Sequence, residues 1–134
     1  MADTMQFDLV SPEKSLASAQ VTEVQIPGAE GDLTAMPNHA PLITTLRPGV
    51  LKASGPDGAM EYVVTGGFAE ISAAGTSVLA ERAYAVTDLT QDILAGLLDE
   101  GKAALEAAPA EANDALAKQV ADIQAMGSKV GLSV

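Results

Sequence analysis

A sharp change in residue types near position 88 is the feature that most limits how this 134-residue chain can fold. All four aromatic residues, six of the seven prolines and eight of the twelve glycines precede Asp88. Eleven alanines fall in the 47 residues from Asp88 onward. Proline and glycine favour frequent turns, whereas alanine is the best helix former. The sequence therefore predicts two units, residues 1–87 and residues 88–134.

The first unit has the pattern of short strands separated by turns. Large apolar residues alternate with polar or smaller ones over residues 60–64 (MEYVV), which is typical of a half-buried strand. The sequence GPDG at residues 55–58 predicts a hairpin turn between this strand and residues 50–53 (VLKA). Further turn signals recur about every ten residues, which favours an antiparallel β-sandwich or barrel.

The second unit has the pattern of two helices. Leu89, Ile93 and Leu97 recur every four residues, and Pro109 ends the first helix because the residue before a proline is disfavoured in a helix. A second helix is predicted from about residue 110 to residue 126. Its apolar stripe consists of Ala112, Leu116, Val120, Ile123 and either Val130 or one of its neighbours. Two amphipathic helices joined by a short turn predict an antiparallel hairpin.

This hairpin is expected to be weak on its own. Gly96 and Gly101 each cost about 1 kcal/mol relative to alanine inside a helix, and the apolar stripe is narrow and rich in alanine. We therefore expect the hairpin to pack on the first unit or on another protein, and to be able to detach.

The charge and the absence of cysteine exclude several classes of function. A net charge of −11 argues against binding to nucleic acid and against unaided docking on anionic lipid. No run of 18 apolar residues is present, so direct insertion into a membrane is not expected. The first ten residues contain two acidic and no basic residues, which is neither a signal-peptide nor a transit-peptide pattern. Without cysteine there are no disulfides and no thiolate metal sites.

The single histidine, His39, is the main candidate for catalytic chemistry. One histidine and no cysteine cannot build the usual zinc sites within one chain, and no G-x-S-x-G, P-loop or G-x-G-x-x-G sequence is present. A small hydrolase that uses His39 is therefore the weakest hypothesis. The favoured interpretation is a loop histidine that is fixed by hydrogen bonds or lies at an interface, between Pro37 and Pro41.

Six short motifs occur in a specific order along the chain. They are residues 7–13 (FDLVSPE), 27–33 (PGAEGDL), 36–44 (MPNHAPLIT), 46–49 (LRPG), 66–70 (GGFAE) and 79–83 (LAERA). This ordered set resembles the epsilon subunit of the F-type ATP synthase, and the resemblance covers essentially the whole chain. It implies a β-sandwich of about ten strands followed by a two-helix hairpin, in agreement with the patterns above.

The resemblance also implies a function. It predicts a non-catalytic central-stalk (rotor) subunit without a cofactor, which binds the gamma subunit and the c-ring and couples proton-driven rotation to ATP synthesis. The hairpin is the part that would reach the beta and alpha subunits. The expected location is peripheral, on the cytoplasmic face of the bacterial inner membrane, where protein contacts hold the subunit.

Two sets of contact residues are carried over from the family. Contact with the polar loops of the c-ring is implied for Glu30, Gly31 and Asp32. A loop facing gamma or the ring is implied for His39, Ala40, Pro41 and Leu42. On residue types alone, the two acids around a glycine are also typical of a solvated turn. Asn38 stands where the family usually has glycine, and both residues tolerate a left-handed turn.

The hairpin departs from the regulatory members of the family. In many bacterial members the extended hairpin blocks ATP hydrolysis through basic residues, and some members bind ATP through an I/L-D-x-x-R-A motif. Here residues 89–94 read LTQDIL, which lacks the Asp and the Arg of this motif. Residues 98–103 read LDEGKA, a similar sequence in which Asp99 and Lys102 take the places of the motif's Asp and Arg. We interpret these two residues as solvated helix surface.

From Asp88 onward there are eight acidic and three basic residues, a net charge of −5. Such a hairpin would be repelled by an acidic segment of beta. The sequence therefore predicts weak or absent inhibition and weak or absent ATP binding. A nucleotide-sensing module, whose hairpin closes over ATP, is the alternative function.

Overall fold

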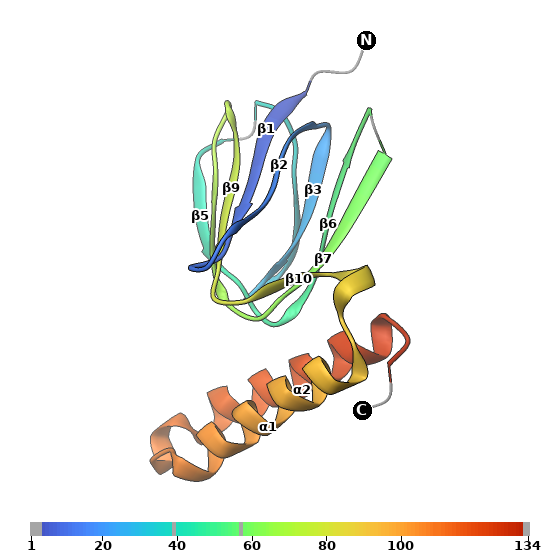
Figure 1. Cartoon of the computed structure of the whole chain (residues 1–134). Helices are drawn as coiled ribbons and strands as arrows, with labels where there is room; N and C mark the ends of the chain where they lie inside the picture. The colour runs from blue at the N-terminus through green and yellow to red at the C-terminus, as the bar shows by residue number, and fades with distance from the viewer. Residues whose placement is uncertain (1–3, 39, 57, 133–134) are drawn as a thin grey trace.

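A ten-stranded β-sandwich followed by a two-helix hairpin is the architecture of the computed structural model, which describes residues 4–38, 40–56 and 58–132 (Figure 1). Sheet A has the strand order β2-β1-β9-β8-β5. Its strands are β1 (Met5–Val10), β2 (Ser15–Val21), β5 (Leu42–Thr45), β8 (Gly67–Ile71) and β9 (Gly75–Ala80). Sheet B has the order β10-β7-β6-β3-β4. Its strands are β3 (Glu23–Gly28), β4 (Gly31–Ala35), β6 (Gly49–Gly55), β7 (Gly58–Val64) and β10 (Ala83–Ala85). The predicted fold class is confirmed.

One strand pair departs from the antiparallel arrangement that the turn signals predict. β1 and β9 run parallel, with Gln6 opposite Gly75, whereas the other strand pairs in the described part of the chain are antiparallel. A short turn can join only antiparallel neighbours, so local turn signals carry no information about a pair so far apart in sequence.

The sandwich core follows from strict alternation along the strands. On β7, Tyr62 and Val64 point into the core, while Val63 between them points to the outer face of sheet B. On β1, Phe7 and Leu9 are fully buried. Successive side chains of a strand face opposite ways, so each sheet has an inner face toward the core and an outer face toward other elements or solvent.

The second unit forms the predicted antiparallel hairpin. α1 (Gln91–Ala107) follows a short 3-10 turn, η1 (Val86–Asp88), and α2 (Asn113–Lys129) follows another, η2 (Ala110–Ala112). The Thr90 hydroxyl caps α1 by accepting a hydrogen bond from the Ile93 N–H at 3.2 Å. The loop between the helices lies at the end of the hairpin that projects away from the sandwich (Figure 1).

The buried face of α1 is wider than the sequence predicts. Leu97 is buried as expected, and so is Leu89, which precedes the helix. Ile93 is only partly buried, whereas Leu94 and Leu98 are buried. α1 packs along α2, and its buried residues belong to a cluster that also contains Val63 of the sandwich, so its apolar arc is wider than one stripe. On α2 the buried positions are Val120, Ile123, Met126 and Gly127.

Candidate partner-binding site

The described residues contain no group of three or more His, Cys, Asp or Glu side chains that could hold a metal ion. Within the described part of the chain no helix is long and apolar enough to cross a membrane. Three surfaces of the described residues have a defined geometry and are the candidate sites.

The first surface is an exposed apolar strip on the outer face of sheet A. Phe68 on β8 lies opposite both Leu79 on β9 and Thr45 on β5, and Leu79 lies beside Val10 on β1. Ile43 shares this face because it precedes Thr45 by two residues. The exposed fractions are 68% for Ile43, 41% for Phe68 and 46% for Leu79. We call these three residues the sheet A strip. Contiguous exposed apolar residues of this size are typical of a contact site for another macromolecule.

The second surface is its counterpart on the outer face of sheet B, where the hairpin covers it. Val50, Val63 and Tyr84 form a row across β6, β7 and β10. Val63 is completely buried and belongs to the same apolar cluster as Leu94 and Leu98 of α1. We call this row the sheet B row. The hairpin packs on the sandwich here, which is one of the two arrangements that the sequence left open.

An ion pair supports the same docked arrangement. Arg82, between β9 and β10, approaches Glu100 of α1 at 2.8 Å, with side chains 49% and 56% exposed. The hydrogen bond and the charge of Glu100 raise the pKa of Arg82 above its ordinary value, with a smaller contribution from Tyr84. Because the pKa of Arg82 is raised, the stability that its charge contributes is fully present at every pH below the ordinary pKa of arginine. It is lost only as the pH rises through the raised pKa. Arg82 is therefore protonated throughout the physiological range.

The third surface is the acidic turn between β3 and β4. Glu30 and Asp32 are exposed, and Gly31 has a φ of 140°, which favours glycine. Arg47 lies beside this turn, where its Nη1 donates a hydrogen bond of 2.6 Å to the Gly28 carbonyl oxygen and its Nη2 pairs with the Asp32 carboxylate. Of the two acids that the family resemblance assigns to the c-ring, Asp32 is therefore already paired within the chain.

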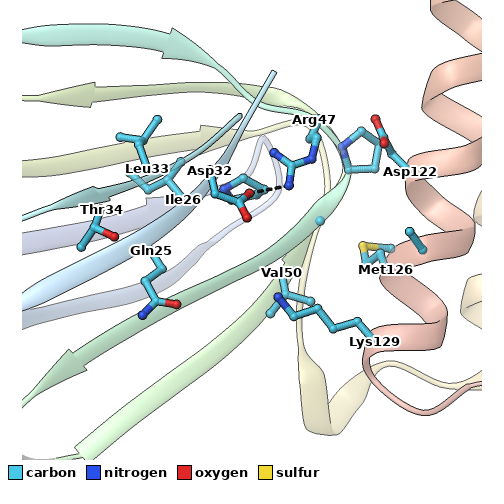
Figure 2. Close-up of a pocket in the computed structure, with 14 residues that line it drawn as sticks. Gln25, Ile26, Asp32, Leu33, Thr34, Arg47, Val50, Asp122, Met126 and Lys129 are labelled. Atoms are coloured by element: carbon cyan, nitrogen blue, oxygen red, sulfur yellow. Dashed lines mark hydrogen bonds and ion pairs between the residues drawn. The ribbon is translucent and has the colours of Figure 1, made fainter. Parts of the chain in front are cut away.

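A cavity of about 290 Å³ separates this turn from α2. Figure 2 shows Asp32 and Arg47 on the sandwich side, with Asp122, Met126 and Lys129 of α2 across from them. Its charges are mostly compensated, because Asp122 pairs with Lys118 at 2.7 Å. The cavity borders the seam between hairpin and sandwich, and Val50 of the sheet B row contributes to its lining.

The predicted loop facing gamma or the ring leads directly into the sheet A strip. Ala40, Pro41 and Leu42 are exposed, and Leu42 begins β5 immediately before Ile43. His39 lies outside the described residues. Asn38 has a φ of 67°, a left-handed conformation that asparagine tolerates.

The look-alike residues of the nucleotide motif, Asp99 and Lys102, are exposed on α1. The sequence alone did not single out Arg47, Phe68 or Leu79 as candidate contact residues. The LRPG and GGFAE motifs contain Arg47 and Phe68, but only strand register reveals which side chains they meet.

Comparison with known proteins decides the family. A sequence profile of the delta/epsilon chain β-sandwich domain of ATP synthase matches residues 4–86. The chain belongs to the ATP synthase epsilon chain family. It is 54% identical to the ATP synthase epsilon chain of Ruegeria sp. (strain TM1040), over 98% of this chain and all of the relative. It is also 54% identical to that of Rhodobacter capsulatus, again over 98% of this chain and all of the relative.

Solved structures show the same fold at much lower sequence identity. A chain in the structure of the OSCP/F1/c-ring of Euglena gracilis mitochondrial ATP synthase matches with a TM-score of 0.72 and 18% identity. The match covers 95% of this chain and 81% of that one. A chain of the Tetrahymena thermophila central stalk/c-ring matches with a TM-score of 0.64 and 14% identity, covering 95% and 96%. Membership in the epsilon chain family agrees with the prediction of a non-catalytic subunit.

Proposed function

We propose that this chain is a rotor subunit of a bacterial ATP synthase. In this proposal it binds the gamma subunit through the sheet A strip and the c-ring through the acidic turn, and so couples proton-driven rotation to ATP synthesis. Family membership supports the assignment to the complex. One observation supports the assignment of the gamma contact to the sheet A strip. The strip is exposed, whereas the sheet B row is covered by the chain's own hairpin.

The proposed division of contacts follows from the chemistry of the surfaces. The sheet A strip is apolar and includes an aromatic residue, as in the centre of a stable protein interface. The turn at Glu30 is polar and exposed, which suits a wet contact with polar loops that mainly sets register. The strip therefore suits the permanent partner, gamma, and the turn suits the ring.

β5 connects the two proposed contacts mechanically. It supplies Ile43 to the strip, and the Thr45 carbonyl oxygen accepts a hydrogen bond of 2.9 Å from the Ala29 N–H in the β3–β4 turn. An isolated bridge between Gly28 and Leu46 continues this connection. A force applied at the turn would thus reach the strip through a few hydrogen-bonded residues, which is the property a coupling element needs.

We infer a peripheral location on the cytoplasmic face of the inner membrane. The described residues contain no helix that could cross a membrane, and the net charge of −11 would repel an anionic lipid surface. Attachment would then depend on protein contacts with gamma and the ring.

The gamma contact can be tested with two substitutions on the strip. Phe68→Ser combined with Leu79→Ser should weaken binding to a catalytic head of alpha, beta and gamma subunits by about 30-fold or more, the effect of losing one interface hot spot. Phe68 and Leu79 are 41% and 46% exposed, so part of each side chain is buried, and binding should be measured at a temperature at which thermal unfolding shows the variant to be folded. Glu61→Ser, an exposed substitution on sheet B, is the control and should bind normally. Unchanged binding of the strip variant would contradict the assignment.

We also infer that the hairpin inhibits ATP hydrolysis weakly or not at all. Its net charge of −5 disfavours docking on an acidic segment of the beta subunit. The buried Val63 also packs in the same apolar cluster as the hairpin and so stabilises the docked arrangement. Deleting residues 88–134 should leave the hydrolysis rate of the assembled enzyme nearly unchanged. Because the deletion uncovers Val63, the truncated chain should carry Val63→Thr to limit aggregation. A many-fold rise in hydrolysis would show that the hairpin is an inhibitor.

A further inference from the structure

We propose that Arg47 is a positioning residue that fixes the β3–β4 turn, and that Glu30 rather than Asp32 presents the charge that a basic partner side chain meets. The role of Glu30 rests on the proposed function, because it requires that this turn meet the c-ring. The role of Arg47 in holding the turn does not.

The Arg47 side chain bonds to residues on both sides of the β3–β4 turn. Its Nη1 donates to the Gly28 carbonyl oxygen before the turn, and its Nη2 pairs with the Asp32 carboxylate after it. Its own backbone N–H donates to the Pro27 carbonyl oxygen at 3.0 Å, which fixes the origin of the side chain. A planar guanidinium can reach two acceptors at once in this way, whereas a lysine ammonium is a single point on a flexible stem.

The ion pair between Arg47 and Asp32 changes the charge that the turn presents. Asp32 and Arg47 together are neutral, and the Arg47 side chain is the more buried of the two, at 26% exposed against 74%. Glu30 is exposed and, among the described residues, has no hydrogen-bond or ion-pair partner. One uncompensated negative charge therefore remains, at the tip of a turn whose shape Arg47 sets. Its matching partner is a lysine or arginine side chain in a polar loop.

The two possible roles of Asp32 predict opposite effects of removing Arg47. If Asp32 contacted the partner directly, Arg47→Ala would release a second carboxylate and strengthen binding. If Arg47 positions the turn, Arg47→Ala displaces Glu30 and weakens binding. The sign of one affinity change thus separates the two roles.

The test measures the affinity of catalytic heads carrying each variant for purified c-rings in nanodiscs, at low and high ionic strength. Glu30→Gln should reduce affinity at low salt by up to about fivefold, the scale of one exposed ion pair, and remove most of the salt dependence. Arg47→Ala and Asp32→Asn should each weaken binding, and the double variant should be no weaker than either single variant. Asp32→Glu should retain binding. Tighter binding by Arg47→Ala, or additive losses in the double variant, would overturn the proposal.

A second measurement, on the free chain, tests without the ring whether the contacts of Arg47 hold the turn in place. The Ala29 amide, which bonds to Thr45, should exchange faster in Arg47→Ala and in Asp32→Asn but not in Glu30→Gln. Unchanged exchange in Arg47→Ala would overturn the positioning role. If heads with and without the wild-type chain bound rings equally well, the proposed ring contact and the role of Glu30 would fail, whereas the exchange rates would still decide the role of Arg47.

Discussion

Val63 offers the sharpest test of how the hairpin is held, because its neighbour provides a matched control. Val63 and Val64 are adjacent on β7 and both completely buried, but Val63 packs against the hairpin cluster and Val64 against the sandwich core. Replacing either with alanine removes two carbon atoms, which costs about 2 kcal/mol in lost burial and cavity formation. The loss of strand propensity is also similar at the two positions.

The two substitutions should differ in amide exchange of the hairpin. Both should lower global stability by a similar amount. Only Val63→Ala should promote local detachment of the hairpin, because Val64 belongs to the sandwich core and not to the hairpin cluster. A loss of about 2 kcal/mol corresponds to an increase of about 30-fold in the population of the detached state. A detached hairpin should exchange quickly, since its glycines and alanine-rich stripe stabilise it poorly. Equal acceleration of the α1 and α2 amides in both variants, or none in Val63→Ala, would refute the docking argument.

Three further substitutions test the local geometry, by urea unfolding in each case. Gly96→Ala should raise stability by about 0.5–1 kcal/mol, because a Cβ there meets no atom within 4 Å and the residue lies inside α1. Gly67→Ala should lower it by more than about 2 kcal/mol, because Gly67 has a φ of 110° and a Cβ would collide with the Leu79 carbonyl oxygen. Arg82→Ala should lower it by less than about 1 kcal/mol, as for an exposed ion pair, and the difference should fade at high salt. A salt-independent Arg82 effect, a tolerated Gly67→Ala or a destabilising Gly96→Ala would each contradict the corresponding contact.

The parts of the fold that depend on local chemistry could be predicted from the sequence. Pro109 ends the first helix, the glycine-rich turns separate the strands, and the change in composition at Asp88 separates sandwich from hairpin. These signals act within a few residues of the chain, where propensity and turn chemistry dominate. The parallel pairing of β1 with β9 could not be predicted, because it joins segments without a connecting turn.

The contact surfaces required knowledge of strand register. Ile43, Phe68 and Leu79 come from three strands, and nothing in their own sequence neighbourhoods shows that they share a face. Likewise, the sequence identifies Asp32 as an acid in a turn but not as the partner of Arg47, fifteen residues away. The buried arc of α1 shifted toward Leu94 and Leu98 for a similar reason, since tertiary packing rather than helical period alone determines it.

The most direct test of the rotor assignment is co-elution on a sizing column. The purified chain would be mixed with a catalytic head that contains alpha, beta and gamma subunits but lacks epsilon. If the chain is a rotor subunit, one copy of it should be retained per gamma. Elution of the chain at its own monomer size, beside a head that binds a known epsilon chain normally, would contradict the rotor assignment.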